Sequence, residues 1–549
     1  MKVYEALAAA FAAEGSDDIF GLMGDGNMYW MAAMERHRHM RVFEARHEGA
    51  SLAMADGWAR ANGKVGVCAV TCGPGLAQLA TSLIVAARAS TPIVIFAGES
   101  PTNDPEYVQK MEQQKFIEAC EAGFVPLLNA ETAYEAVQTA FYRAKLESRP
   151  VVLNAPMDIQ MYDFPAGEEY RPSSALIPAA RVQPDPTLLD QAAQLVMDSH
   201  KPVIVAGRGA VLAAARDEIR QLASRTGALL GTSLLTKGLF AGDEFDAGIC
   251  GLYGTRAAME LFSESDLVIG VGASLNNYTT EHGYVFPEAK YIQIDLKPHA
   301  RMGGGRSADV YLQGDAKATV ASLCGRLSSR DWEQIGYRTP ETHEALQAPI
   351  YRATWTIEPG RVDPREAAEV MDELLPVDIP LIVGGGHFVS FPVMHMTKPG
   401  RPNITTVQWG CIGQGVGTAI GAGVAYGGRP TLLVDGDASA MMHIQEMDTA
   451  VRYKLPLLLV VDNDEALGAE YHKLRAHDLN ADLAAIPSPD FATLGRGFGC
   501  RGKLVRSIPE LREALTEFVR DPLPTIIDLR VSRQVVSQAY RRLHFGEFD

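Results

Sequence analysis

The chain has 549 residues, of which 47% are hydrophobic and 21% charged, so it is too long for one hydrophobic core and typical of a soluble globular protein with about three domains. Its formal net charge of −17 argues against a nucleic acid or an anionic membrane as partner. No apolar run reaches membrane-spanning length, and the first residues lead into an amphipathic helix without a signal peptide. The seven scattered cysteines form no CxxC pair, which favours reduced thiols in a cytoplasmic protein.

Short apolar runs alternate with helical periods in three successive segments, which predicts an α/β fold with three doubly wound parallel-sheet domains. We place these domains at residues 1–165, 187–330 and 360–535, with a polar and aromatic tail at residues 536–549. A polar, proline-rich passage at 164–186 and a charged passage at 331–364 separate them and are predicted to be linkers. The runs that we predict as strands are Val65–Val70, Ile93–Ala97, Val151–Asn154, Val203–Ala206, Leu267–Gly270, Tyr291–Asp295, Thr431–Val434, Pro456–Val461 and Thr525–Leu529.

The first segment contains four motifs with polar or glycine-rich character. In chain order they are Gly24-Asp25-Gly26-Asn27, Arg46-His47-Glu48-Gly49, Thr71-Cys72-Gly73-Pro74-Gly75 and Gln109-Lys110-Met111-Glu112-Gln113. A carboxyl group such as that of Glu48 suits proton transfer when burial raises its pKa. Read alone, Glu48 is equally a surface residue at the start of a helix, and Asp25 a turn residue.

The third segment has two aspartates, Asp437 and Asp464, each at the end of a predicted strand. A helical stretch, Met441–Lys454, and the strand Pro456–Val461 lie between them, so the second strand should return parallel to the first. Both side chains then lie at the carboxyl edge of one sheet, where open α/β sheets bind ligands, and their oxygens suit Mg²⁺. The alternative is that each aspartate caps its own turn.

The order and spacing of these motifs resemble the thiamine-diphosphate enzymes, the family that includes acetolactate synthase, pyruvate decarboxylase and benzaldehyde lyase, over nearly the whole chain. This resemblance implies pyrimidine-binding, central and diphosphate-binding domains in that order. It also implies that Mg²⁺ is bound by Asp437, by the side chain of Asp464 and by the backbone carbonyl of Ala466. Two positions depart from the family pattern, because Ala438 replaces a glycine and Asp464 replaces an asparagine.

The resemblance also implies the residues that would hold thiamine diphosphate. Glu48 would bond the N1′ atom of the aminopyrimidine and activate the cofactor, and Ile412 would wedge between its two rings. The other implied cofactor contacts are Gly73, Gln78, Gly386, His387, Gly436, Ala438, Ser439 and Leu467. In the family, the first domain of one subunit and the third domain of another complete each site, so we expect a homodimer or homotetramer with sites at the subunit interface.

The motifs that would select the reaction are mixed. Asp25 and Glu470 match segments of decarboxylases, whereas Gln113 matches synthases and lyases, and these three residues together with His387 are candidates for substrate handling. The implied reaction is cleavage of a C–C bond in a small 2-oxo acid or ketone, giving an enamine that is protonated or added to an acceptor carbonyl.

Three alternatives to this decarboxylase/carboligase stay open. One is an acetolactate-synthase-like carboligase or a C–C lyase acting on 2-hydroxyketones or diketones, and another is a non-catalytic cofactor-binding subunit. A dinucleotide-binding protein would need a GxGxxG turn in a convincing context, which we do not find. In the central segment Gly207-Arg208-Gly209 is a weak glycine signal, so FAD is an option there that we do not favour.

Overall fold

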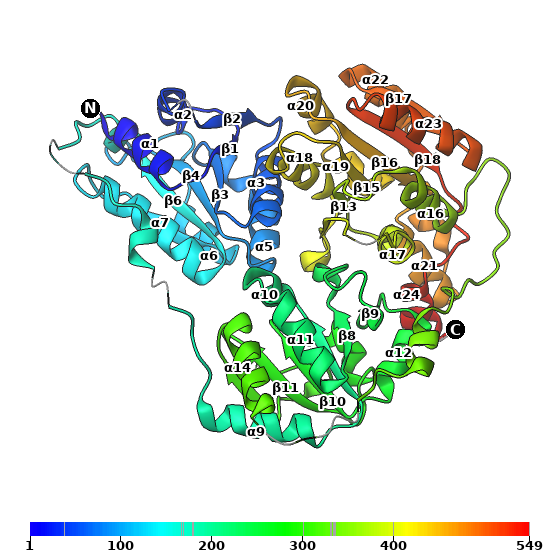
Figure 1. Ribbon diagram of the computed structural model, residues 1–549. Coiled ribbons are helices and arrows are strands. Elements are labelled where there is room, and N and C mark those ends of the chain that lie inside the picture. Colours follow the sequence, from blue (N-terminus) through cyan, green and yellow to red (C-terminus); the bar gives the residue numbers. More distant parts are fainter. Residues whose placement is uncertain are drawn as a thin grey trace. The chain divides into compact units, whose positions relative to one another are not determined.

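Three six-stranded parallel sheets, with helices on both faces, make up the protein (Figure 1), which confirms the predicted α/β fold class. The computed structural model describes residues 1–37, 39–165, 167, 169–177, 180–299, 301–329, 332, 336–398 and 400–547. Two compact units are distinguished: residues 1–178, 358–389 and 406–533 form the first, and residues 179–357, 390–405 and 534–549 form the second.

The first sheet of the first unit has the strand order β2-β1-β3-β4-β6-β5. Its strands are β1 (Asp18–Gly21), β2 (Arg41–Glu44), β3 (Gly66–Val70), β4 (Ile93–Glu99), β5 (Gly123–Pro126) and β6 (Pro150–Pro156). Because side chains alternate along a strand, Val67, Phe96 and Leu153 share one face and pack with Phe11 and Phe141 into one core. The accompanying helices are α1 (Val3–Ala13), α2 (Met28–Met34), α3 (Glu48–Asn62), α4 (Pro74–Ala77), α5 (Ala80–Arg88), α6 (Gln113–Ala119), α7 (Ala133–Glu147) and α8 (Met157–Gln160).

The third sheet along the chain has the order β14-β13-β15-β16-β18-β17. Its strands are β13 (Leu381–Val383), β14 (Asn403–Thr405), β15 (Thr431–Gly436), β16 (Leu457–Asn463), β17 (Arg501–Val505) and β18 (Thr525–Arg530). β15 and β16 are paired in parallel, as the spacing of the two aspartates predicts. Its helices are α16 (Pro364–Leu374), α18 (Gly415–Ala425), α19 (Asp437–Met442), α20 (Glu446–Arg452), α21 (Gly468–Ala476), α22 (Phe491–Phe498) and α23 (Ile508–Arg520).

Helices α3 and α18 pack closely within this first unit (Figure 1). This close approach requires glycine: a Cβ atom at Gly421 would lie 1.8 Å from the carbonyl oxygen of Met54, and one at Gly57 would lie 2.1 Å from that of Thr418. No other residue type fits at these two positions without moving the backbones apart. The first residue of α3 is Glu48, so this packing helps to fix the backbone position of Glu48.

The predicted single helix over Met441–Lys454 is wrong. The chain forms two short helices, α19 and α20, because His443 leaves helical geometry with φ −134° and ψ 28°. Its ring nitrogen Nδ1 lies 2.6 Å from the carbonyl oxygen of Gly413, a contact that an uninterrupted helix would not allow. A tertiary hydrogen bond therefore overrides local helical periodicity at this point.

The second unit contains the central sheet, of order β12-β11-β10-β7-β8-β9. Its strands are β7 (Pro202–Ala206), β8 (Leu229–Thr232), β9 (Asp246–Ile249), β10 (Leu267–Val271), β11 (Lys290–Asp295) and β12 (Val310–Gln313). The helices are α9 (Pro186–Met197), α10 (Arg208–Leu212), α11 (Arg216–Thr226), α12 (Arg256–Ser263), α13 (Asn277–Thr280), α14 (Ala316–Ser328), α15 (Pro340–Leu346), α17 (Ser390–His395) and α24 (Gln538–Tyr540). Helix α15, capped by the Thr339 side chain, gives local structure to the passage predicted as a linker.

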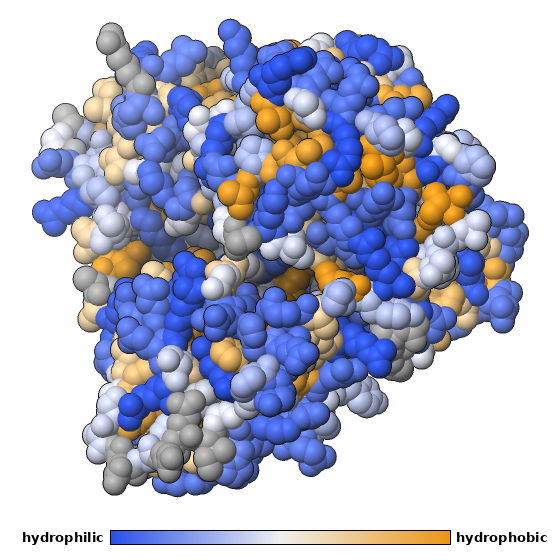
Figure 2. Space-filling model, turned by 45° about the vertical axis from the view of Figure 1, so that its right-hand side comes forward, coloured by the Kyte–Doolittle hydropathy of each residue, from blue (hydrophilic) through white to orange (hydrophobic). Residues whose placement is uncertain are grey.

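The domain boundaries at residues 165, 187, 360 and 535 stay predictions, and Arg330 and Asp549, the predicted ends of the central domain and the tail, lie outside the described residues. All seven cysteines are free thiols, as expected. Within the described part of the chain, no helix is long and apolar enough to cross a bilayer. The face in Figure 2 is mostly hydrophilic, and its apolar side chains gather in separate patches.

Candidate active site

The carboxyl edge of β15 and β16 brings the two predicted metal ligands together. Asp437 is the first residue of α19, directly after β15, and Asp464 directly follows β16. Burial raises the pKa of Asp437 above its ordinary value. Burial and, second, the charge of Asp437 raise the pKa of Asp464 to about 7. Two desolvated carboxylates, one of which raises the pKa of the other, form a site that a divalent cation would stabilise.

The donor set fits a small, hard cation. Across the described residues, no group of three or more His, Cys, Asp or Glu side chains is arranged around a common metal position. The predicted set has only two such side chains, Asp437 and Asp464, and takes its third ligand from the backbone of Ala466. Magnesium usually has few protein ligands and keeps water or phosphate oxygens in the other positions, so two carboxylates suffice. The three ligand assignments stay predictions.

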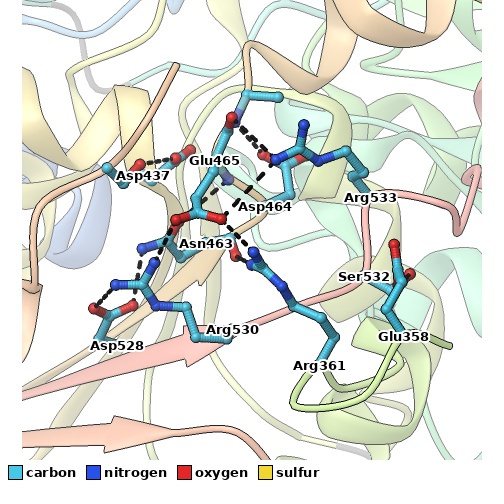
Figure 3. A network of polar contacts seen from close by, with 12 residues as sticks. Glu358, Arg361, Asp437, Asn463, Asp464, Glu465, Asp528, Arg530, Ser532 and Arg533 are labelled. Atoms are coloured by element: carbon cyan, nitrogen blue, oxygen red, sulfur yellow. Dashed lines mark hydrogen bonds and ion pairs between the residues drawn. The ribbon is translucent and has the colours of Figure 1, made fainter. Parts of the chain in front are cut away.

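Hydrogen bonds from neighbouring turns orient both carboxylates (Figure 3). The Ser488 hydroxyl donates to Asp437 Oδ2, and the Ala438 amide donates to Asp437 Oδ1 at 2.9 Å. On the second aspartate, the Ala466 amide donates to Asp464 Oδ1 at 3.0 Å. A Cβ atom at position 468 would lie 2.8 Å from Asp464 Oδ2, so Gly468 leaves the space that this carboxylate occupies.

The turn that carries Ile412 is bound to the same sheet edge. The Gly413 amide donates to the Ser439 hydroxyl at 3.0 Å, and Ile412 itself is half-buried. A Cβ atom at Gly436 would lie 2.9 Å from the ring of Phe388, so the strand end approaches the Gly386–Phe388 turn closely. The structure thus brings the predicted cofactor contacts Gly386, Gly436 and Ser439 to one edge of the sheet.

His387 lies buried on this edge, beside a second histidine that the sequence analysis did not single out. Its ring centroid is 4.2 Å from that of His472 on α21. Burial lowers the pKa of His387 well below its ordinary value, and burial also lowers the pKa of His472 to about 4. Both rings are therefore neutral at pH 7, which favours a role in packing or hydrogen bonding over one as a cation.

In the first domain, Glu48 meets the glycine turn predicted to accompany it. His47 caps α3 by accepting the Gly49 amide at 3.0 Å on Nδ1, which leaves Glu48 half-buried at the helix start. A Cβ atom at Gly75 would lie 3.5 Å from Glu48 Oε1. The two motifs, which are about 25 residues apart in the sequence, are therefore adjacent in the structure.

Asp25 lies exposed in a tight turn near the same motif. The Gly24 amide donates to Asn27 Oδ1 at 2.8 Å, and the Gly26 amide donates to Thr71 Oγ1 at 2.9 Å. Burial is the largest cause that raises the pKa of the neighbouring Cys72 thiol, and the charge of Asp25 adds to it. Cys72 in turn donates to Gln109 Oε1 at 3.2 Å, so Gln109, which belongs to the motif that ends in Gln113 but was given no role of its own, also lies beside this turn.

Gln113 is buried, and its amide group is occupied by protein partners. Its Oε1 accepts the Gly73 amide at 2.7 Å, and its Nε2 donates to the Gly98 carbonyl at 2.9 Å and to Asn154 Oδ1 at 2.5 Å. This arrangement supports the turn that contains Gly73. Direct substrate handling by Gln113 stays a prediction.

Three other candidates are Glu470, Gln78 and Leu467. Glu470 on α21 is exposed and pairs with Lys473 at 3.4 Å. Gln78 ends α4 and is exposed. Leu467 is half-buried, and its amide donates to the Ala484 carbonyl at 2.8 Å. Their assigned roles stay predictions.

Two residues that the sequence did not reveal, Glu446 and His443, link the motifs of the first domain around Glu48 to those of the third domain around Asp437; these are the two motif groups. The buried Glu446 carboxylate accepts the Arg46 backbone amide at 3.0 and 3.1 Å, and it is also hydrogen-bonded by the His47 amide. The ring of His443, which contacts the Gly413 carbonyl, lies 5.1 Å from the ring of His47. Within one chain, α20 and the α19–α20 junction thus fix the segment that leads into Glu48. These partners are about 400 residues apart in sequence, so no local pattern indicates them.

Comparison with protein families gives three matches in the same order as the sheets. Residues 1–121 match the thiamine pyrophosphate enzyme N-terminal TPP binding domain, residues 189–323 its central domain, and residues 384–529 its C-terminal TPP binding domain.

Curated relatives cover nearly the whole chain. The acetolactate synthase large subunit of Parasynechococcus marenigrum is 30% identical over 96% of this chain and 87% of its own length. The sulfoacetaldehyde acetyltransferase of Castellaniella defragrans is 29% identical over 97% of this chain and 94% of its own. The acetolactate synthase isozyme 2 large subunit of Escherichia coli is 28% identical over 95% of this chain and 94% of its own length. Together with the sheet edge that gathers the cofactor motifs, these matches show that the chain belongs to the thiamine-pyrophosphate-dependent enzymes.

Proposed function

We propose that this enzyme uses thiamine diphosphate and Mg²⁺ to cleave the C–C bond next to the carbonyl of a small 2-oxo acid, and that it joins the remaining fragment to an acceptor carbonyl. The observation that carries the proposal is the gathering of Asp437, Asp464 and the Ile412 turn at one sheet edge, with the Ser439 hydroxyl bonded to the Gly413 amide. A metal–diphosphate group and the two rings of one cofactor need those elements next to each other.

Each group has a defined task in this proposal. Asp437, Asp464 and the Ala466 carbonyl hold the metal, while the Ser488 hydroxyl and the Ala438 amide fix the first carboxylate. Bound thiamine diphosphate supplies an electron sink for the bond that breaks. Ile412 packs against the cofactor and keeps its rings in a reactive orientation.

Glu48 holds and moves a proton at the N1′ atom of the aminopyrimidine. Its half-buried position beside Gly75 limits access of water to the carboxyl group. We further propose that each Glu48 serves the cofactor of a partner subunit in a homodimer or homotetramer. Asp25 is the candidate acid in the turn that is hydrogen-bonded to Thr71, and Gln113 acts by positioning the Gly73 turn.

Carboligation is favoured over simple decarboxylation because the relatives include acetolactate synthases and an acetyltransferase, whose names denote transfer of a carbon fragment. Simple decarboxylation is the second candidate, supported by the ordered Asp25 turn. FAD is not part of the proposal, because a Cβ atom at Gly207 would lie 2.3 Å from the Gly272 carbonyl oxygen, so this glycine serves chain packing.

The test is to incubate the purified protein with thiamine diphosphate and Mg²⁺, first with pyruvate and other 2-oxo acids alone and then with added 2-oxo acid or aldehyde acceptors. Released CO₂ and products are followed by mass spectrometry. We expect cofactor-dependent CO₂ release and a C–C-joined product. An aldehyde as sole product would favour the second candidate, and absence of turnover with every 2-oxo acid would refute the proposal.

A further inference from the structure

Glu465, between two predicted metal ligands, is surrounded by three arginines from separate parts of the chain (Figure 3). Arg530, at the end of β18, places Nη1 2.9 Å from Glu465 Oε1, and Arg361, before α16, forms an ion pair with Oε2. Arg533, just after β18, lies 4.0 Å from Oε2. One carboxylate is thus shared by three guanidinium groups. Ordering and desolvating four charged side chains costs more free energy than forming a single surface ion pair.

The same arginines also bind the backbone of the turn. Arg361 Nη1 donates to the Asn463 carbonyl at 3.3 Å, and Arg533 Nη2 donates to the Glu465 carbonyl at 3.5 Å. Asn463 is held separately, since its Nδ2 donates to Asp528 Oδ1 at 2.9 Å. The path of residues 463–467 therefore depends on charged side chains as well as on the end of β16.

The backbone at Glu465 is strained. Its φ of +58° lies in the left-handed region, which non-glycine residues rarely adopt. Such conformations persist only where surrounding contacts hold them, and they gather at functional sites. On the far side, the Ile486 amide donates to the Glu465 carbonyl at 2.9 Å, so the strained residue is held from both sides.

The consequence concerns the neighbours of Glu465. Asp464 and Ala466 flank it, and the Ala466 amide already bonds Asp464 Oδ1. A change in the backbone angles of Glu465 would turn the Asp464 side chain and the Ala466 carbonyl relative to each other and to Asp437 on the adjacent strand.

We propose that Glu465, Arg361, Arg530 and Arg533 form an anchor that sets the divalent-metal affinity by holding the 463–467 turn in its strained conformation. These four are positioning residues that do not touch the metal. The inference rests on the proposed metal site. It adds the residues that would orient the metal ligands, as outer-shell partners typically do.

The test is a Mn²⁺ titration of the full-length protein in the presence of thiamine diphosphate, with free Mn²⁺ followed by electron paramagnetic resonance. E465Q and R533Q are compared with R512Q, which breaks an exposed arginine–glutamate pair with Nη1–Oε1 at 2.9 Å in the same unit. We expect Mn²⁺ binding about 10–100-fold weaker for E465Q and R533Q, as for other outer-shell changes. R512Q should stay within about twofold of the unaltered protein.

The variant E465G distinguishes an effect of the anchor on metal affinity from a general failure to fold. Glycine accepts a positive φ without strain, so this variant should fold even if E465Q does not, as circular dichroism would report. Weakened Mn²⁺ binding in folded E465G supports the anchor, whereas affinity equal to that of the unaltered protein overturns it. Failure of the unaltered protein itself to bind Mn²⁺ would instead refute the proposed metal site, and with it this inference.

Discussion

Glu446 offers a sharp test of how the two motif groups depend on each other. Its carboxylate is fully buried and accepts the Arg46 and His47 amides as well as the Thr449 hydroxyl at 2.7 Å. Glu446→Ala leaves three donors without this acceptor. Since hydrogen bonds to charged groups contribute about 1.5–3 kcal/mol each and water recovers part of the loss, we expect a decrease of about 3–5 kcal/mol in the free energy of unfolding.

The catalytic effect of Glu446→Ala should exceed what the loss of stability alone explains. The freed segment leads directly into Glu48, and a displacement of about 1 Å in a reacting group can reduce the rate about 100-fold. We therefore expect kcat/KM in the product assay to fall about 100-fold at a temperature where the variant remains folded. Calorimetry should show cofactor binding reduced far less, because the metal and diphosphate contacts belong to other elements.

Thr449→Val is the graded control, because it removes the hydroxyl that donates to Glu446 and accepts from Arg452 Nη2 at 2.9 Å, and it leaves both backbone amides bonded to Glu446. It should cost about 1.5–3 kcal/mol of stability, the value of one hydrogen bond to a charged group, with little change in kcat/KM. If Glu446→Ala lowered stability as expected but left kcat/KM equal to that of Thr449→Val, the positioning of Glu48 by α20 would be refuted.

Three further results are expected. Gly421→Ala should lower the free energy of unfolding by about 1–3 kcal/mol, because the added methyl would meet the Met54 carbonyl, whereas Gly497→Ala, with open space around it in α22, should be neutral or stabilising; equal melting shifts would contradict the close α3–α18 packing. Asp437→Ala should abolish Mg²⁺-dependent binding of thiamine diphosphate in calorimetry, and retained binding would remove this residue from the metal site. Burial raises the pKa of Asp246 from 3.8 to about 6, so the folded state retains this proton to a higher pH than the unfolded state does. The free energy of unfolding should therefore fall by up to about 3 kcal/mol as the pH rises from about 4 to about 6. Asp246→Asn should remove that part of the pH dependence in urea titrations, and an unchanged profile would exclude Asp246 as its source.

The strands and the placement of the two aspartates were predictable because their signals are local. Runs such as Leu457–Val461 are apolar on every residue, as in a strand buried on both faces, and a parallel return forces Asp437 and Asp464 to the same edge. The break between α19 and α20 was not predictable, since it depends on the contact of His443 with the Gly413 carbonyl, 30 residues earlier in the chain.

The supports of the site escape sequence analysis for the same reason. The arginine anchor joins Glu465 to Arg361, about 100 residues earlier, and to Arg530, 65 residues later. Charge patterns along the chain do not show which surface arginines fold onto a particular carboxylate. Sequence reasoning therefore finds residues whose role follows from their own motif, and the structure adds those that act by holding other residues.

The central claim is that Glu48 activates a cofactor held by Asp437 and Asp464. It is tested most directly by the exchange rate of the C2 proton of bound thiamine diphosphate, measured by quenched hydrogen–deuterium exchange and NMR in the unaltered protein and in Glu48→Gln. The account predicts exchange about 10²–10⁴-fold slower in Glu48→Gln, with Mg²⁺ and cofactor binding retained. Equal exchange rates in the two proteins, with the cofactor fully bound in both, would contradict it.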